Sequence, residues 1–242
     1  GQSPRTERLP TGVGQSVRMA PTAARVNLFS DTQTLPTPAM RRAIANADVG
    51  DEQMMADPTV NHLCERVADL LGFEAAVFLP SGTMCNEIAI RVHVRAGGDA
   101  LFLHRTAHVL RYEAGAPAAL SAAVLVALDG PRGMFDASTL EAAIADHSVD
   151  RYSARPRLVS IEQTTNLAGG RVWPLEQARE VLEVAGRHRM RAHLDGARLM
   201  NASVASGVAP AEWCRGFDTA WIDFTKGLGA PFGAALAGSR SL

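Results

Sequence analysis

Short apolar runs alternate with amphipathic stretches of helical length from Val26 onward. Runs with the length and composition of buried strands lie at residues 75–79, 100–103, 123–127, 158–161, 192–194, 219–222 and 234–237. Between several of them apolar residues recur at helical spacing, notably over 140–144 and 174–188. Strands that alternate with helices predict an α/β layered fold, in which a mainly parallel sheet carries helices on both faces.

Local signals mark two helix starts. Asp57 followed by Pro58 is an N-cap residue with proline at the first helical position, and apolar residues recur at helical spacing through 63–71. The second signal is the loop 81–83, which separates the strand-like run 75–79 from a further helical pattern. These signals predict a helix, a strand, a tight loop and a second helix in succession.

The ends of the chain differ from its middle. Residues 1–25 are rich in Gly, Pro, Ser and Arg and lack an apolar period, which predicts a flexible N-terminal arm. The last strand-like run ends a few residues before Leu242 and leaves no room for a separate C-terminal domain. We therefore expect one folded domain over residues 26–242.

Composition narrows the class of protein. Of the 242 residues 47% are apolar, and 24 Lys+Arg against 25 Asp+Glu give a net charge of -1. This balance provides no general attraction to nucleic acid or anionic membranes. The three cysteines are odd in number and far apart, which excludes a disulfide framework and a CxxC metal site. With no apolar run near the ~20 residues of a membrane helix and no secretory h-region, we expect a cytoplasmic protein.

Common catalytic signatures are absent from the sequence. It contains no GxxxxGK[ST] phosphate loop and no GxSxG nucleophile elbow, and the glycines of 227–232 lack the third glycine of a dinucleotide fingerprint. His104 and His108 are four residues apart, but the glutamate of an HExxH motif is missing. We expect no metal site.

Three other segments carry candidate chemistry. The loop of Ser81, Gly82 and Thr83 precedes a helix whose free N–H groups suit a phosphate, although an ordinary N-cap turn has the same sequence. Asp195 and Arg198 follow a strand-like run, where α/β sheets bind ligands, although a surface ion pair is the alternative.

The third segment contains Lys226, the one lysine among the 24 basic residues. Exclusion of water disfavours a charged lysine and makes its amine a nucleophile for an aldehyde, whereas a lysine at a strand's exit to solvent is the alternative. Together, an anion site, a carboxylate and a lysine are the parts that pyridoxal 5'-phosphate (PLP) needs. They would hold its phosphate, pair with its pyridinium nitrogen and attach it covalently.

These segments resemble the threonine aldolase and β-eliminating lyase family of fold-type-I PLP enzymes. Residues 27–37 are similar to the family's LRSDTVTxPT segment and residues 78–84 to its FxPSGTMxN segment. Residues 194–198 are similar to DGAR, and residues 225–231 to SKGLxAP. The resemblance implies the PLP-binding large domain of that fold, in a homodimer or homotetramer that acts on an amino acid as its small-molecule substrate.

The resemblance also implies individual roles. Lys226, with Thr225 beside it, would hold the cofactor covalently, and Asp195 would pair with the pyridine nitrogen. The phosphate would lie on Ser81, Gly82 and Thr83.

For the substrate, the resemblance implies four further contacts. His108 matches a histidine that stacks on the cofactor and handles a substrate proton, although a helix-face histidine is its alternative. Arg198 and Ser30 match groups that bind the α-carboxylate, for which a guanidinium fork is suited, and Arg198 also counts among the cofactor-binding residues. Thr165 stands where the family has a histidine near the substrate hydroxyl.

The implied reaction is cleavage of the Cα–Cβ bond of a β-hydroxy-α-amino acid, of threonine or phenylserine type, to glycine and an aldehyde. Thr165 forms hydrogen bonds but is no base near neutral pH, so His108 or a bound water would have to serve. A PLP-dependent β-eliminating lyase, or another reaction at Cα or Cβ, therefore stays an alternative. A truncated, non-catalytic relative that binds PLP or dimerises is another.

Two further departures from the family pattern concern the rest of the chain. Residues 50–58 carry methionine where the family has a tyrosine that helps to build the site, so we expect a less polar wall. The family's smaller C-terminal domain, of roughly a hundred residues, has no counterpart here. We therefore expect either a fragment or a naturally shortened member.

Overall fold

The structure, a computed structural model, describes residues 26–147 and 150–242. The predicted flexible arm, residues 1–25, lies outside the described residues. The chain divides into two units, of which the first ends at Ser30 and the second spans Asp31–Leu242. Within the first unit, residues 26–30 form neither a helix nor a strand.

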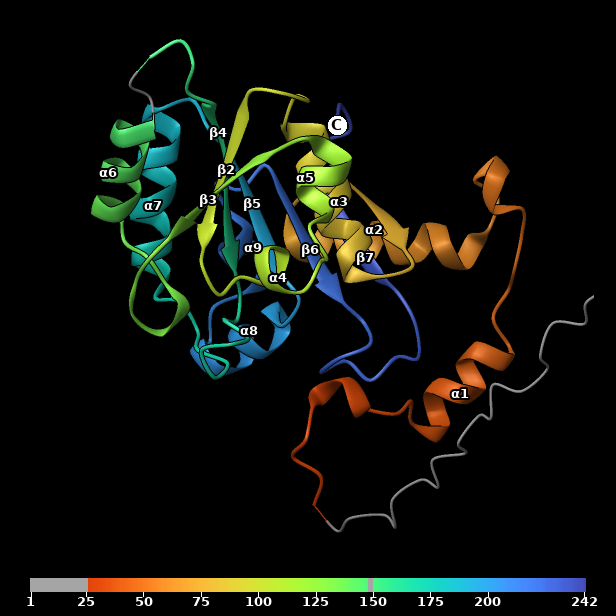
Figure 1. Cartoon of the computed structure of the whole chain (residues 1–242). Coiled ribbons are helices and arrows are strands. Elements are labelled where there is room, and N and C mark those ends of the chain that lie inside the picture. The colour runs from red at the N-terminus through yellow and green to blue at the C-terminus, as the bar shows by residue number, and fades with distance from the viewer. Residues whose placement is uncertain (1–25, 148–149) are drawn as a thin grey trace, which may run out of the picture. The chain divides into compact units, whose positions relative to one another are not determined.

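One sheet of seven strands forms the centre of this unit, in the order β1-β7-β6-β5-β4-β2-β3 (Figure 1). Its strands are β1 (Ala75–Leu79), β2 (Asp99–His104), β3 (Val124–Leu128), β4 (Arg155–Glu162), β5 (Arg191–Gly196), β6 (Thr219–Asp223) and β7 (Ala234–Gly238). Each predicted strand overlaps one of them.

The prediction of a mainly parallel sheet is confirmed, because β3, β2, β4, β5 and β6 pair in parallel. Strand β7 differs, since it runs antiparallel to both β1 and β6. Residues 224–233, which join β6 to β7, contain no helix. A parallel crossover needs a dozen or more residues, so this short connection returns the chain antiparallel beside β6.

Helices cover both faces of the sheet. One face packs against α2 (Pro58–Leu71), α6 (Ala137–His147), α7 (Leu175–Arg187) and α9 (Pro210–Cys214), and the other against α3 (Gly82–His93) and α5 (Ala116–Ser121). The short helices α4 (His108–Arg111) and α8 (Leu199–Ser206) follow β2 and β5. Within the described ranges, no helix is both long and apolar enough to cross a membrane.

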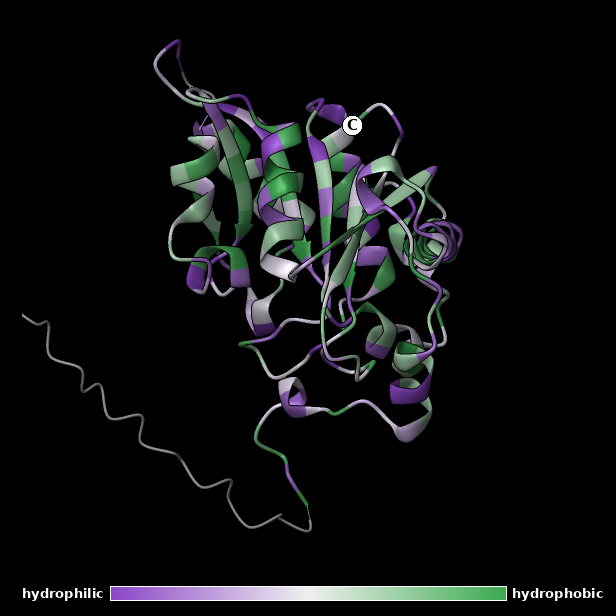
Figure 2. Cartoon of the chain, turned by 90° about the vertical axis from the view of Figure 1, so that its right-hand side faces the viewer, coloured by the Kyte–Doolittle hydropathy of each residue, from purple (hydrophilic) through white to green (hydrophobic). Residues whose placement is uncertain are grey.

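The alternation of side chains along the strands explains the two layers. Phe102 contributes to the core beneath α6 and α7, whereas its neighbours Leu101 and Leu103 pack on the opposite face with Ile90 of α3. All four are fully buried, and apolar residues dominate the strands (Figure 2). Such burial from both sides is expected for a sheet with helices on each face.

Both predicted helix starts are confirmed. The Asp57 carboxylate accepts a hydrogen bond from the Val60 amide at 2.8 Å, with Pro58 as the first residue of α2. The Ser81 hydroxyl accepts one from the Met84 amide at 3.2 Å and begins α3. Each cap satisfies an amide that the helix itself leaves unpaired.

Polar residues gather at one edge of the sheet, where the parallel strands end. Strands β2, β4 and β6 end at His104, Glu162 and Asp223, and Asp195 is the second-to-last residue of β5. The first turn of α3 lies at the same edge, because it follows the end of β1, which runs in the same direction as β6. Ligands of α/β sheets bind at this edge.

Candidate active site

A cavity of about 250 Å³ opens at the edge where the parallel strands end. Its lining includes eight of the ten predicted site residues: Ser81, Gly82, Thr83, His108, Asp195, Arg198, Thr225 and Lys226. It also includes Glu162, Trp221 and Asp223, which the sequence did not single out. Residues from separate segments of the chain therefore converge on one site.

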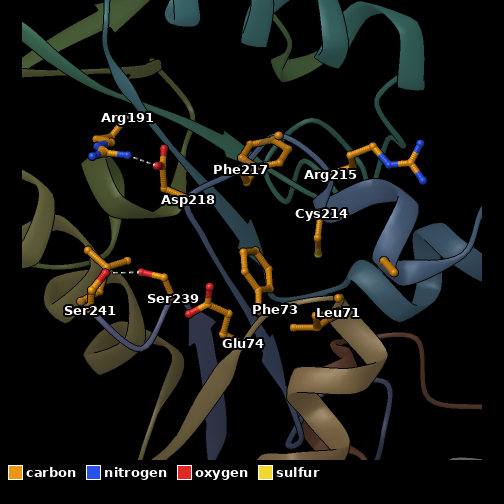
Figure 3. A pocket seen from close by; sticks show the side chains of 14 residues that line it. Leu71, Phe73, Glu74, Arg191, Cys214, Arg215, Phe217, Asp218, Ser239 and Ser241 are labelled. Carbon is orange, nitrogen blue, oxygen red and sulfur yellow. Dashed lines mark hydrogen bonds and ion pairs between the residues drawn. The ribbon is translucent and has the colours of Figure 1, made fainter.

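A larger cavity, of about 640 Å³, lies at the opposite edge of the sheet. Figure 3 shows its wall, where Arg191 and Asp218 pair across 2.5 Å near the starts of β5 and β6. None of the predicted site residues lines it. The smaller cavity is therefore the candidate active site, because the candidate chemistry lies there.

Lys226 follows β6 and turns back toward its last residue. Its Nζ lies 2.7 Å from Oδ2 of Asp223, and both side chains are largely buried, with 16% and 5% exposed. The other oxygen of Asp223 accepts hydrogen bonds from the amide and hydroxyl of Thr225, both at 2.7 Å. Thr34 donates its hydroxyl to the Lys226 carbonyl at 2.6 Å. The backbone and ammonium of Lys226 are thus both fixed.

Asp195 is a buried carboxylate without an ion-pair partner in the parts of the chain that the structure describes. Its oxygens accept hydrogen bonds from Asn86 Nδ2 at 3.0 Å and from the Ala197 amide at 3.2 Å. Burial raises the pKa of Asp195 despite these bonds. A cation beside it would favour the ionised form.

The first turn of α3 forms a compact wall of the cavity. A Cβ atom on Gly82 would lie 2.1 Å from the ring of Trp221, which is itself buried. Only glycine lets the start of α3 approach this ring. The free amides at the positive end of a helix suit an anion.

Arg198 follows β5 and lines the cavity, but one edge of its guanidinium is occupied. Its Nε and Nη2 donate to the two oxygens of Asp31 at 2.5 and 2.8 Å. The Arg198 guanidinium lowers the pKa of Asp31. Asp31 lies within the 27–37 segment that resembles the family, although the sequence alone gave it no role.

Glu162 ends β4 and has only 8% of its surface exposed. Burial and the charge of Asp195 raise the pKa of Glu162 to about 8. It therefore carries a proton near neutral pH and can donate it within the cavity. The sequence signal that could have identified Glu162 is its position directly after the strand-like run 158–161.

His108 begins α4 and lines the cavity, with 33% of its side chain exposed. Its Nδ1 lies 2.8 Å from Oε1 of Glu113, whose side chain is fully buried. Neither Glu113 nor Asn86, which bonds to both Glu113 and Asp195, was predicted from the sequence. Asn86 lies on α3 and Glu113 in the bend between α4 and α5, and in neither place does the local sequence pattern signal a buried polar residue.

Two predicted site residues do not line the cavity. Thr165 is fully buried, and its amide and hydroxyl donate to the Arg171 carbonyl at 3.0 and 3.4 Å. Ser30 lies in the first unit of the chain. Their contacts with a substrate stay predictions.

Comparison with known proteins finds a matching sequence family and similar relatives. The sequence family described as beta-eliminating lyase matches residues 27–242. Low-specificity L-threonine aldolase 1 of Arabidopsis thaliana is 39% identical over 89% of this chain and 61% of its own length. The probable low-specificity L-threonine aldolase 2 of the same plant is 38% identical over 92% of this chain and 63% of its own length.

The fold has close counterparts among solved structures. The threonine aldolase of Leishmania major superposes with a TM-score of 0.74 and 25% identity, over 86% of this chain and 60% of that one. The predicted fold-type-I architecture is thereby confirmed. The chain spans about three fifths of the length of these relatives. From the match over residues 27–242, the chain belongs to the beta-eliminating lyase family.

Proposed function

We propose that this chain forms the cofactor site of a PLP-dependent aldolase, a lyase that cleaves a β-hydroxy-α-amino acid of threonine or phenylserine type to glycine and an aldehyde. The observation that carries the proposal is the convergence of Lys226, Asp195 and the first turn of α3 on one cavity. The relatives named as threonine aldolases support it.

The residues present fit PLP. Asp195 is a buried carboxylate whose pKa is raised and which lacks an ion pair with any described residue, as expected for the partner of a pyridinium nitrogen. Lys226 supplies the one side-chain amine for covalent attachment, and the start of α3 with Ser81 and Thr83 supplies donors for a phosphate. When bound, PLP offers an aldehyde to the lysine and a ring that accepts the electron pair of the broken bond.

The protein's own groups would then bind the substrate and move its protons. Arg198 holds the α-carboxylate through the part of its guanidinium that Asp31 leaves unoccupied. His108 takes the β-hydroxyl proton on Nε2, since its Nδ1 is paired with Glu113. Asp223 holds the Lys226 ammonium at 2.7 Å until the amine is required.

Titration with PLP tests the cofactor assignment. We expect the purified protein to develop a visible absorption band, and borohydride reduction to fix the cofactor on the tryptic peptide that contains Lys226. The Lys226→Ala variant should lose this attachment, whereas Glu183→Gln, at an exposed position outside the cavity, should keep it. Attachment that persists in Lys226→Ala would overturn the assignment.

Product analysis tests the reaction. We expect aldehyde release from threonine or phenylserine and no oxoacid release from serine. Oxoacid from serine without aldehyde would instead establish the β-eliminating alternative, which uses the same Lys226 and Asp195. Cofactor attachment without either product would support a PLP-binding relative that does not turn over.

Assembly with a second copy of the chain is part of the proposal. Between Asp31 and Asp57, helix α1 (Pro38–Ala45) and the short helices η1 (Asp31–Gln33) and η2 (Glu52–Met54) contain no buried residues. Apolar side chains stand exposed along this segment: Leu35, Ile44, Val49, Met54 and Met55. Exposure of these apolar side chains to water is unfavourable. We therefore expect light scattering to detect a homodimer or homotetramer, and the Val49→Asp variant to dissociate more readily.

We also propose that the protein works in the cytoplasm. Its three cysteines are free thiols, and the two most buried lie on α3 and α9. Free thiols fit a reducing compartment. Imaging of the tagged full-length protein tests this placement.

A further inference from the structure

A continuous chain of buried hydrogen bonds runs behind the cavity and ends at His108. It passes from His93 through Thr219 and His193 to Asn86, over distances of 3.0, 2.8 and 3.0 Å. Asn86 then donates from Nδ2 to Asp195 at 3.0 Å and to Glu113 at 2.8 Å. Oε1 of Glu113 in turn forms a hydrogen bond with Nδ1 of His108. Apart from His108, every member is buried, with at most 3% of its surface exposed.

Two groups fix the direction of these bonds. The indole Nε1 of Trp221 only donates, and it lies 2.7 Å from Oδ1 of Asn86. Burial lowers the pKa of His193 to about 3, so its ring is neutral and carries a single N–H. Because Oδ1 of Asn86 accepts from Trp221, this N–H belongs on Nε2 of His193, 3.0 Å from the same oxygen. The amide oxygen of Asn86 is therefore an acceptor, and its NH₂ group points to the two carboxylates.

The bond between Glu113 and His108 then has one favoured proton arrangement. Oε1 of Glu113 accepts from Asn86 and also lies 2.8 Å from Nδ1 of His108. A carboxylate holds a proton less tightly than an imidazole, so the shared proton belongs to Nδ1. A neutral His108 ring consequently has no proton on Nε2.

Glu87 is a second buried carboxyl group, next to Glu113. Both oxygens of Glu87 and Oε2 of Glu113 are buried and lack a hydrogen bond within the described residues. Burial and the neighbouring Glu113 raise the pKa of Glu87 to about 8. Glu87 therefore carries a proton near neutral pH, which avoids a second buried negative charge beside Glu113.

We infer that Glu113 is a positioning residue for His108: it holds the ring as the Nδ1–H tautomer, so that Nε2 keeps its lone pair for a proton in the cavity. Asn86 orients Glu113 and Asp195 with one NH₂ group, which links the position of the base to that of the pyridinium partner. The tautomer follows from contacts within the protein, whereas its use as a base rests on the proposed function. Second-layer contacts of this kind set the tautomer of functional histidines.

Nitrogen-15 NMR of histidine-labelled protein tests the tautomer directly. The two ring nitrogens give distinct shifts when protonated and unprotonated, and comparison with His108→Gln identifies the resonances among the seven histidines. We expect a protonated Nδ1 and an unprotonated Nε2 near neutral pH, with and without PLP. A protonated Nε2 in the wild-type protein would overturn the inference.

Variants of Glu113 separate its hydrogen bond from its charge. Glu113→Gln keeps an oxygen that accepts from Nδ1, so the tautomer should persist while Nε2 becomes less basic and kcat falls on the order of tenfold or more. Glu113→Leu removes the acceptor, so the fraction of the Nε2–H form should rise. The matched control is Glu87→Gln, which alters the neighbouring buried carboxyl without contacting His108 and should leave the tautomer unchanged.

These measurements distinguish this inference from the proposed function. The spectra need no substrate, so a chain without aldolase activity would still show the Nδ1–H tautomer if Glu113 positions the ring. An unaltered tautomer in Glu113→Leu would overturn the inference even in an active enzyme. If Glu113→Leu fails to fold, the wild-type and Glu113→Gln spectra decide.

Discussion

Replacing Glu87 by glutamine should stabilise the protein, by an amount that grows as the pH rises. Glu87 has 7% of its surface exposed, no described group donates a hydrogen bond to its oxygens, and its neighbour is the carboxyl group of Glu113. Burial and Glu113 raise its pKa from 4.5 to about 8. Below pH 4.5 the carboxyl is protonated in both the folded and the unfolded chain, so it carries no pH-dependent penalty.

Between the two pKa values, the unfolded chain releases the proton while the folded protein retains it, so stability decreases. Each unit of pKa difference corresponds to about 1.4 kcal/mol, which sets the full penalty above pH 8 on the order of 5 kcal/mol. Local rearrangement on ionisation reduces this value, and we expect at least about 2 kcal/mol. Glutamine has the shape of the protonated carboxyl and cannot ionise, so the variant avoids the penalty.

Urea unfolding followed by circular dichroism measures the effect. The free energies of unfolding of Glu87→Gln and wild type should nearly coincide at pH 4.5 and separate progressively up to pH 8, with the variant more stable. The control Glu183→Gln changes an exposed carboxyl for which no such separation is expected. A difference between Glu87→Gln and wild type that stays constant with pH would refute the reasoning.

Three further predictions concern other parts of the site and the core. Gly82→Ala places a methyl group 2.1 Å from Trp221 and should lower stability by roughly 1–3 kcal/mol through overpacking while weakening PLP binding; an unchanged melting temperature would contradict this. Asp31→Asn removes the charge that orients Arg198 and should raise the KM of the amino acid on the order of tenfold with kcat nearly unchanged, whereas a loss in kcat alone would assign Asp31 another role. Burial raises the pKa of all three thiols, and only Cys64 is more than marginally exposed. A thiol reagent should therefore label the native protein slowly and at Cys64 alone. Rapid labelling of all three thiols would contradict this expectation.

The strands and the longer helices were predictable because they have local signals in the sequence. Strands buried on both faces appear as continuous apolar runs, and the caps at Asp57 and Ser81 give the starts of α2 and α3. The reversal at β7 was not predictable from periodicity, since an apolar run has no direction. The length of the connection after Asp223 decides that direction instead.

The sequence analysis singled out most of its candidate residues from recognisable segments, and it missed the groups that contact them. Lys226 and Asp195 follow apolar runs and belong to recognisable segments, and both line the cavity. Asp223 was missed as the partner of Lys226, because an Asp–Lys spacing of three residues predicts an ion pair only where the backbone turns. Asp31 was missed because its partner, Arg198, lies far along the chain, and a contact between distant residues leaves no local pattern in the sequence.

The sequence analysis missed the residues that complete the hydrogen bonds of other buried polar groups. Asp195, the proposed partner of a pyridinium nitrogen, is buried, and its burial raises its pKa although hydrogen-bond donors lower it. Asn86 supplies such a donor, but its amide oxygen then needs donors of its own, which Trp221 and His193 provide. The remaining hydrogen of its NH₂ group needs an acceptor, and Glu113 provides it. Each addition creates the next requirement, so the residues behind the cavity are fixed by hydrogen-bond completeness, which only the folded arrangement reveals.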